Sequence, residues 1–231
     1  MPTVLLREAV RVTPRTRLLR LDLDQGAFVF RAGQAVMAGR PHTEARSPYS
    51  IASPPALAAR GTLELLVAAD GAFGDPDLDP VSIVGQRLAI EGPIGTFGVP
   101  AAAADAPLLL VAGGTGISPL RSVAFDRLER TAAPPMALVY SARRFDEFAF
   151  GAEFAELDRR GRLRAHLTVT RDDRPGDWTG RSGRIDDALL AAALPSSDAW
   201  CLVCGPAGFV ASVSASLEGL GVPAERIVVE R

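Results

Sequence analysis

Two rhythms of hydrophobic and polar positions follow one another along the chain. Up to about Val99, apolar residues come in short alternating bursts that Gly and Pro interrupt. Alternation with period two is the pattern of a strand with one buried face. Many short strands of this kind are typical of an antiparallel β-barrel or sandwich. The bursts lie at residues 4–6, 17–23, 35–38, 63–68 and 87–91.

The rhythm changes after residue 106. Continuous apolar runs suited to buried strands now alternate with helical stretches, and this order predicts a doubly wound α/β fold with a parallel sheet. The strands are expected at 108–112, 136–140, 163–169, 200–204 and 226–229, and the helices at 119–131, 147–160 and 207–220. We therefore expect a β-barrel domain over 1–100, an alanine-rich linker at 100–106 and an α/β domain over 106–231.

Composition places the chain among ordinary globular proteins. It has 231 residues, of which 48% are hydrophobic and 23% are charged. The formal net charge is −2, so we expect neither a nucleic-acid surface nor a polybasic membrane anchor. All 25 basic residues are arginine. A lysine Schiff base, a lysine nucleophile and the lysine of a P-loop are therefore excluded.

Neither a signal peptide nor a metal site is expected. The first residues lack an apolar stretch, and no later window has about 18 consecutive apolar residues, so we expect a cytoplasmic protein. The only cysteines, Cys201 and Cys204, form a C-x-x-C in an expected strand, where residues three apart point to opposite faces. His42 and His166 are the only histidines, which is too few to complete a zinc or iron–sulfur ligand set.

A glycine-rich turn follows the first strand of the second half. Residues 108–112 run directly into Gly113-Gly114-Thr115-Gly116, and Pro119 suits the first turn of the next helix. A strand that turns into a helix leaves backbone N–H groups and the positive end of the helix dipole at one place, where a phosphate can bind. Glycines let the backbone approach such a ligand closely. The spacing matches neither a Walker loop nor G-x-G-x-x-G, and a plain strand-to-helix turn is the alternative.

Other motifs stand around this turn. Before it come Arg46-Ser47-Pro48-Tyr49-Ser50-Ile51 and residues 84–97; after it come Tyr140-Ser141-Ala142-Arg143, Thr170-Arg171, Gly180-Arg181 and Cys204-Gly205-Pro206. With these motifs in this order, the chain resembles the ferredoxin–NADP reductase superfamily across nearly its whole length.

The resemblance implies a fold and an activity. It implies an N-terminal FAD-binding β-barrel, a C-terminal NAD(P)-binding α/β domain, and hydride transfer in the cleft between them. Electrons would pass to a separate acceptor such as ferredoxin, flavodoxin or an oxygenase component. Two alternatives stay open: an electron-transfer subunit that is active only within a larger redox complex, and a nucleotide-binding module without redox chemistry.

The resemblance also assigns residues to FAD. Tyr49 would pack on the flavin ring, and the hydroxyl of Ser50 would bond flavin N5. Ser47 stands where the family has an arginine, and Arg46 precedes it by one residue. Glycine also replaces the expected hydroxyl residue at Gly74, so we expect weak, reversible FAD binding. The proposed FAD-binding residues are Arg46, Ser47, Tyr49, Ser50, Ile51, Gly71, Phe73 and Gly74.

The residues assigned to the dinucleotide come from the second half. By resemblance, loops after the strands hold the adenosine ribose, and arginines there favour NADPH because a guanidinium binds the 2′-phosphate well. Asp172 and Asp173 keep NADH open, since a carboxylate can accept hydrogen bonds from ribose hydroxyls. The proposed NAD(P)H-binding residues are Gly114, Thr115, Gly116, Pro119, Ser141, Arg143, Thr170, Arg171, Arg181, Cys204, Gly205 and Pro206.

Three residues are candidates for the catalytic centre, namely Ser50, Cys204 and Glu230. By resemblance the thiol of Cys204 lies near nicotinamide C4 and flavin N5; the alternative is a structural, buried cysteine. Glu230 would lie near the cleft as a proton-relay or orienting carboxylate, and the alternative is an exposed charge at the end of the sequence.

Overall fold

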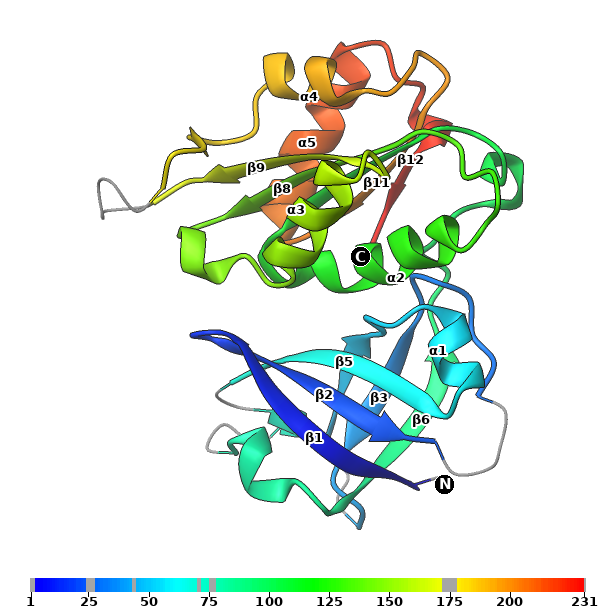
Figure 1. The fold of residues 1–231 in the computed structure, drawn as a ribbon, viewed down its shortest axis with the longest axis vertical. Helices are drawn as coiled ribbons and strands as arrows, with labels where there is room; N and C mark the ends of the chain where they lie inside the picture. Colours follow the sequence, from blue (N-terminus) through cyan, green and yellow to red (C-terminus); the bar gives the residue numbers. More distant parts are fainter. Residues whose placement is uncertain are drawn as a thin grey trace. The chain divides into compact units, whose positions relative to one another are not determined.

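The computed structural model describes residues 3–23, 28–42, 45–69, 72–74, 78–171 and 178–230. It divides into two compact units. The barrel unit comprises Met1–Gly98 and Arg121–Arg127, and the α/β unit comprises Val99–Leu120 and Leu128–Arg231. The expected fold class is confirmed, because the first unit contains an antiparallel sheet and the second a parallel sheet (Figure 1).

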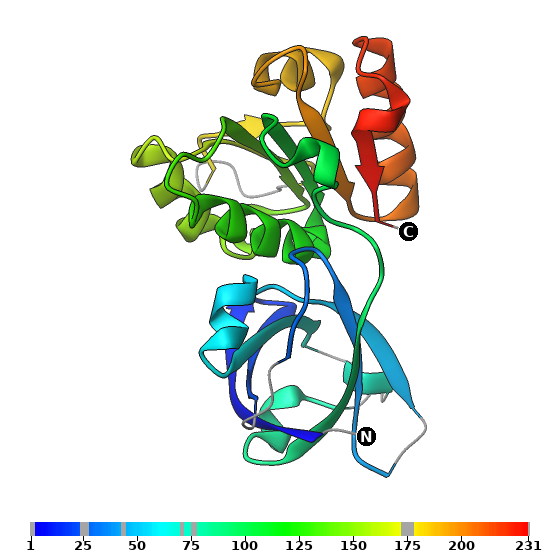
Figure 2. The same cartoon turned by 90° about the vertical axis from the view of Figure 1, so that its right-hand side faces the viewer.

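In the described part of the chain, six antiparallel strands form the sheet of the barrel unit. They are β1 (Thr3–Thr13), β2 (Thr16–Asp22), β3 (Ala35–Gly39), β4 (Arg46–Ser50), β5 (Thr62–Ala68) and β6 (Arg87–Ile94). Their order is β4-β3-β6-β1-β2-β5. A bridge between Ile51 and Leu65 joins the two ends of this order, so the sheet curves back on itself, as Figure 2 shows.

Alternate positions of these strands fill the barrel. On β3, Val36 and Ala38 are fully buried, whereas Ala35 and Met37 are only partly buried. The same alternation explains why the sequence pattern predicts strands here. The buried cluster includes Leu6, Leu19, Leu21, Leu63, Leu65, Leu88 and Ile90.

Among the strands and α-helices described in the barrel unit, β4 and the short helix α1 (Pro55–Ala59) lie outside the predicted strands. Strand β4 contains Pro48, which has no N–H to donate to a sheet and is tolerated because β4 lies at one end of the strand order. Strand β1 is also longer than predicted, because its polar middle residues lie on an exposed face while it pairs with β2.

The α/β unit is built on a parallel sheet. Its described strands are β7 (Leu108–Gly113), β8 (Met136–Ala142), β9 (Arg164–Val169), β10 (Arg181–Ser182), β11 (Trp200–Cys204) and β12 (Ile227–Val229). The order is β10-β9-β8-β7-β11-β12. The residues of β7 and β8 are all buried, which agrees with the continuous apolar runs of the sequence.

Helices cover both faces of this sheet, as expected for a doubly wound fold (Figure 1). The helices that follow β7, β8, β10 and β11 are α2 (Ile117–Leu128), α3 (Gly151–Arg159), α4 (Asp187–Ala193) and α5 (Ala207–Gly219). One face is packed by α4 and α5, whose buried residues Leu190, Val213 and Leu217 cluster with Val111 and Val139 of the sheet. Helix α4 is not among the predicted helices.

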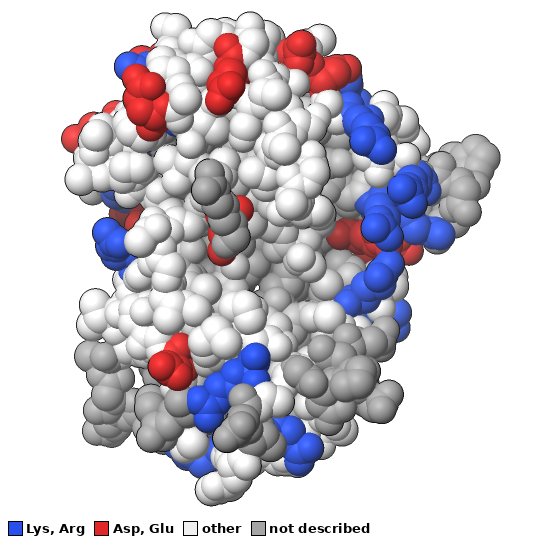
Figure 3. Space-filling view, turned by 180° about the vertical axis from the view of Figure 1, so that it is seen from behind, with Lys and Arg blue, Asp and Glu red and all other residues white. Residues whose placement is uncertain are grey.

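Three further features concern the linker segment, the helices and the surface charge. The segment predicted as a linker contains a 3₁₀ turn at Ala101–Ala103, in which Ala103 is fully buried. Among the described residues, the helices are all too short or too polar to pass through a bilayer. On the face shown in Figure 3, basic and acidic side chains are both present with uncharged surface between them, in keeping with the net charge of −2.

Candidate functional site

The glycine turn has an open backbone. Strand β7 ends at Gly113, residues Gly114–Gly116 form a 3₁₀ turn, and α2 begins at Ile117. The N-cap position of this turn is Gly113, which has no side chain that could bond the N–H groups of the turn. Gly114 has a φ of 56°, in the left-handed region that favours glycine, and no heavy atom of the described residues lies within 4 Å of where its Cβ would be. The turn therefore offers backbone N–H groups at a helix start with space beside them, which suits a phosphate.

A second turn, Cys204-Gly205-Pro206, is packed directly against the first. A Cβ on Gly116 would lie 2.2 Å from the carbonyl oxygen of Cys204, and a Cβ on Gly205 would lie 3.2 Å from the Cα of Gly113. Both contacts are with backbone atoms, which cannot move aside as the end of a flexible side chain can. Ala112 pairs with Cys204 across the sheet, which brings the two turns together at the carboxyl ends of β7 and β11.

Phe209, in the first turn of α5, covers both glycine turns. A Cβ on Gly113 would be 3.0 Å from its ring, and one on Gly205 would be 2.7 Å from it. Phe209 is not among the residues predicted from the sequence. Its place is set by tertiary packing on two glycines, and an apolar residue at a helix start carries no sequence signal of that role.

Cys204 and Glu230 meet beside these turns. The Cys204 thiol donates a hydrogen bond to Oε2 of Glu230, with an Sγ–Oε2 distance of 2.7 Å. The backbone N–H of Glu230 bonds the carbonyl of Val203, which continues the β11–β12 pairing. Burial raises the pKa of the Cys204 thiol above its ordinary value, and the charge and hydrogen bond of Glu230 raise it further. The thiol is therefore protonated at neutral pH.

The residues assigned to the adenosine end lie at the carboxyl ends of β8 and β9 and in the two-residue strand β10. Gly113 pairs with Ser141, and Ser141 pairs with Thr168. Beyond the paired residues, the backbone N–H of Arg171 donates to the carbonyl of Arg143 at 2.8 Å. The side chains of Arg143 and Arg171 are exposed. Arg143 thus follows β8, the neighbour of the strand that leads into the glycine turn, and Arg171 follows β9, one strand further along the sheet.

Arg181 differs from these two arginines. Its guanidinium bonds Asp186, the N-cap residue of α4, and its carbonyl accepts a hydrogen bond from the indole of Trp178 at 2.8 Å. Thr170 also bonds within the protein, through Oγ1 to the carbonyl of Ala142 at 3.3 Å. Arg181 and Thr170 are therefore tied into the strand ends by their side chains, whereas Arg143 and Arg171 are joined to each other through the backbone.

In the barrel unit, the structure brings together the two segments that the sequence predicts to bind the flavin. The hydroxyl of Tyr49 accepts a hydrogen bond from the backbone N–H of Phe73 at 2.8 Å, and the two rings meet edge to face with centroids 5.5 Å apart. Phe73 has a φ of 57°, which is unusual for a bulky residue. Gly74 ends this short turn (Ala72–Gly74), and Gly71 lies outside the described residues, as do Asp172 and Asp173.

Arg46 and Ser47 lie on opposite faces of β4 because neighbouring residues of a strand alternate. Ser47 shares the face of Tyr49, which packs against the barrel core, and Ile51 is fully buried there. Arg46 shares the other face with Ser50 and lies 3.7 Å from a carboxylate oxygen of Glu91. Its Nε is buried without a hydrogen-bond partner among the described residues. That donor could serve a phosphate, so Arg46 fits a place near a pyrophosphate.

A buried ion pair is a further feature that the sequence assignments missed. Glu64 of β5 and Arg121 of α2 are 2.8 Å apart, and both side chains are at most 10% exposed. A signal for it exists in the sequence, because Glu64 is the one charged residue in the apolar run 63–68. A carboxylate in such a run needs a cationic partner.

Comparison with known proteins agrees with this geometry. Residues 110–215 match the family model described as the oxidoreductase NAD-binding domain. Ferredoxin–NADP reductase B of Sorangium cellulosum is 32% identical over 96% of this chain and 94% of its own length. A subunit of the Na⁺-translocating NADH-quinone reductase of Serratia proteamaculans is 31% identical over 68% of this chain, and the match spans only 41% of that relative.

A solved structure shows the same arrangement of elements. The crystal structure of a cytochrome P450 reductase from Amycolatopsis is 26% identical and superposes with a TM-score of 0.82, over 99% of this chain and 68% of the other. The resemblance inferred from the order of the sequence motifs is thereby confirmed. The chain belongs to the ferredoxin–NADP reductase superfamily and is an oxidoreductase of that type, with FAD and NAD(P)H as its cofactors.

Proposed function

We propose that this protein is an FAD-dependent reductase that takes hydride from NADPH in preference to NADH and passes electrons to a separate acceptor. Ferredoxin, flavodoxin and an oxygenase component are the acceptor classes. With two cysteines and two histidines, the chain carries too few ligands for an iron–sulfur cluster of its own, so the proposed acceptor centre lies outside these 231 residues.

The observation that carries the NADPH preference is the pair of exposed arginines, Arg143 and Arg171. Their backbones are joined by a hydrogen bond, so their side chains leave from adjoining strand ends. A 2′-phosphate is a dianion that two guanidiniums bind well, whereas the 2′-hydroxyl of NADH gives them no charge to neutralise. Arg181 contributes less, because Asp186 already neutralises it.

The residues around Cys204 have separate tasks. The turn at Gly114–Gly116 holds the pyrophosphate through backbone N–H groups and the helix start. Glu230 accepts a hydrogen bond from the thiol and so fixes the direction of its S–H group. A neutral thiol is small and weakly polar, and it can lie beside an apolar nicotinamide ring without placing a second charge there. Bound FAD supplies a ring that accepts a hydride and releases electrons to the acceptor.

On the flavin side, Tyr49 gives an aromatic surface to the ring and orders the Phe73 turn. The hydroxyl of Ser50 can either donate or accept, so it can follow the change at flavin N5 on reduction. Arg46 contributes the buried Nε described above to the pyrophosphate. Because Ser47 and Gly74 stand at positions where the family resemblance leads us to expect stronger ligands, FAD binds reversibly.

The test compares the two nicotinamide cofactors on protein reconstituted with FAD, using ferricyanide as acceptor. We expect a higher kcat/KM with NADPH than with NADH. Arg143→Ala and Arg171→Ala should each lower kcat/KM for NADPH roughly 10- to 100-fold, the loss of one charge-assisted contact, and leave NADH almost unchanged. Arg164→Ala is the matched control, since Arg164 is an exposed arginine at the opposite end of β9. Equal losses with both cofactors would refute the 2′-phosphate assignment.

The alternative function is that of an electron-transfer subunit within a larger redox complex. The relative from Serratia proteamaculans is a subunit of such a complex and is named for NADH. A subunit of this kind would bind FAD and NADH but show little turnover alone. Ferricyanide reduction by the isolated protein at several turnovers per second would favour the stand-alone reductase. A pull-down with the FAD-loaded protein would then identify the acceptor.

A further inference from the structure

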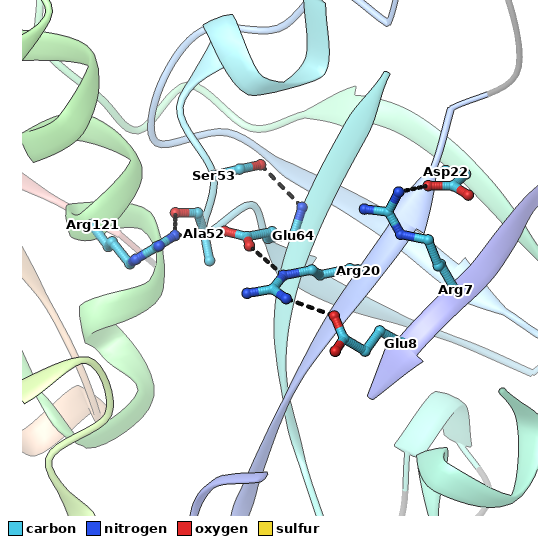
Figure 4. A network of polar contacts seen from close by, with 8 residues as sticks. All are labelled: Arg7, Glu8, Arg20, Asp22, Ala52, Ser53, Glu64 and Arg121. Atoms are coloured by element: carbon cyan, nitrogen blue, oxygen red, sulfur yellow. Dashed lines mark hydrogen bonds and ion pairs between the residues drawn. The ribbon is translucent and has the colours of Figure 1, made fainter. Parts of the chain in front are cut away.

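The buried ion pair between Glu64 and Arg121 is the centre of a chain of charges in the barrel unit. Glu64 accepts a hydrogen bond from Nε of Arg20 at 3.0 Å and from Nη1 of Arg121 at 2.8 Å. Arg20 in turn bonds Glu8 at 2.6 Å. Figure 4 shows Glu64 between Arg20 and Arg121. The four charges alternate in sign, and the chain runs from the half-exposed Glu8 to the buried Arg121.

Arg121 also holds the backbone that follows the flavin segment. Its Nη1 donates to the carbonyl of Ala52 at 2.9 Å as well as to Glu64. The neighbouring Ser122 donates through Oγ to the carbonyl of Ser53 at 2.7 Å. Ala52, Ser53 and Ser122 are completely buried. Two consecutive carbonyls are therefore fixed by two consecutive residues of α2.

The backbone of Glu64, on strand β5, also bonds Ala52 and Ser53. The backbone N–H of Ala52 donates to the carbonyl of Glu64 at 2.8 Å, and the backbone N–H of Glu64 donates to Oγ of Ser53 at 3.0 Å. The ring of Phe125 lies 5.1 Å from the guanidinium carbon of Arg121 and helps to orient it. The backbone of Ala52 and Ser53 is therefore held by a strand and a helix at once.

The position of Ala52 and Ser53 in the chain gives these hydrogen bonds a functional meaning. Ala52 comes directly after Ser50 and Ile51, the end of the proposed flavin segment. Helix α2, which carries Arg121, begins directly after the glycine turn. We propose that Arg121 is a positioning residue, which through Glu64 and the carbonyl of Ala52 fixes the backbone of Ser50 and Ile51 for the flavin. This inference rests on the flavin role proposed above for that segment.

The test separates positioning from stability. Removing one partner leaves a buried charge and destabilises the fold, whereas replacing both partners by apolar residues is often tolerated. The variant is therefore Arg121→Met combined with Glu64→Leu. We expect a melting temperature close to that of the unchanged protein, at least tenfold faster hydrogen exchange at the amides of Ile51 and Ala52, and at least tenfold weaker FAD binding by flavin fluorescence. Flavin reduction at saturating NADPH should slow by a similar factor.

Two further variants sharpen the result. Arg121→Lys keeps an Nζ with three donors, enough for Glu64 and the carbonyl of Ala52, and should restore most of the FAD affinity. Glu8→Gln changes only the half-exposed end of the charge chain and should change none of these quantities. If the double variant does not fold, Arg121→Gln replaces it, since it removes the guanidinium that bonds Glu64 and the carbonyl of Ala52 while Arg20 still pairs with Glu64, and it should speed exchange at Ala52 several-fold.

The possible outcomes distinguish this inference from the flavin assignment. A folded double variant with unchanged exchange and unchanged FAD affinity overturns the positioning role of Arg121. The same result for a folded Arg121→Gln overturns it when the double variant cannot be used. Failure of the unchanged protein to bind FAD, or full activity of Ser50→Ala, overturns the flavin assignment of the segment instead.

Discussion

The contact between the two glycine turns gives the sharpest test of the dinucleotide site. In Gly116→Ala, the new Cβ would lie 2.2 Å from the carbonyl oxygen of Cys204, 2.5 Å from its carbonyl carbon and 2.7 Å from the nitrogen of Gly205. All three neighbours are backbone atoms. Since ordinary carbon contacts begin near 3.4 Å, the two turns must separate by about 1 Å.

The size of the effect follows from this displacement. Forcing an extra methyl group into a packed site costs about 1–3 kcal/mol of stability. A displacement of about 1 Å in a positioning group can reduce catalysis about 100-fold. We therefore expect Gly116→Ala to remain folded but to lose about two orders of magnitude in kcat/KM for NADPH. FAD affinity should not change, because the proposed flavin residues belong to the barrel unit.

The assay is urea unfolding together with ferricyanide reduction at varied NADPH. Gly219→Ala is the matched control, since Gly219 ends α5 and has no heavy atom of the described residues within 4 Å of its Cβ position. Its kcat/KM should match that of the unchanged protein. A Gly116→Ala protein with kcat/KM within about twofold of the unchanged protein would refute the idea that the two turns together bind the dinucleotide.

Three other expectations concern Cys204, Cys201 and Tyr49. Cys204→Ala should slow anaerobic flavin reduction about tenfold or more while FAD stays bound, and an unchanged rate would exclude the thiol from the hydride-transfer step. Burial raises the pKa of Cys201 from 9.0 to about 12, so the stability that the protonated thiol contributes is present below pH 9 and is lost as pH rises from about 9 toward 12. Urea unfolding at pH 7 and pH 10.5 should therefore show lower stability at the higher pH. Iodoacetamide at pH 8 should label the native protein slowly compared with the urea-unfolded chain. Tyr49→Phe leaves the N–H of Phe73 without its acceptor and should cost about 1–3 kcal/mol in urea unfolding, with weaker FAD binding in a fluorescence titration; unchanged affinity would show that the Phe73 turn does not contact FAD.

The strands and the long helices could be predicted from the sequence because their apolar periodicity is also their burial pattern. Strand β7 is the clearest case, with an apolar run of which every residue is buried. Strand β4 could not be predicted in this way. It consists of Arg46, Ser47, Pro48, Tyr49 and Ser50, with one proline and no apolar alternation, and it is a strand because β3 pairs with it along its whole length. Tertiary pairing decided its structure where local preference did not.

The candidate site was also predictable only in part. Motif order predicted two flavin-binding segments, and the hydrogen bond between Tyr49 and Phe73 joins these segments in the structure. It did not identify Arg121 or Phe209, because their roles depend on residues far away in the sequence. Arg121 and its partner Glu64 are 57 residues apart in the sequence, and Phe209 and Gly113 are almost a hundred residues apart. Such partners can be found from sequence only indirectly, as when Glu64 stands as a lone charge among apolar neighbours.

The glycines of the phosphate turn are present for two different physical reasons, which the motif alone does not separate. Gly113 and Gly116 have no room for a Cβ, because Phe209 and the backbone of Cys204 occupy that space. Gly114 has room, but its φ of 56° is costly for a residue with a side chain. An alanine at Gly116 therefore acts by pushing two turns apart, whereas an alanine at Gly114 acts by straining one residue, and asparagine at Gly114 should be tolerated better than alanine because it adopts the left-handed region more readily. Of the three glycines in this turn, only Gly114 has no heavy atom of the described residues within 4 Å of its Cβ position, so Gly114 is where we expect a ligand to approach.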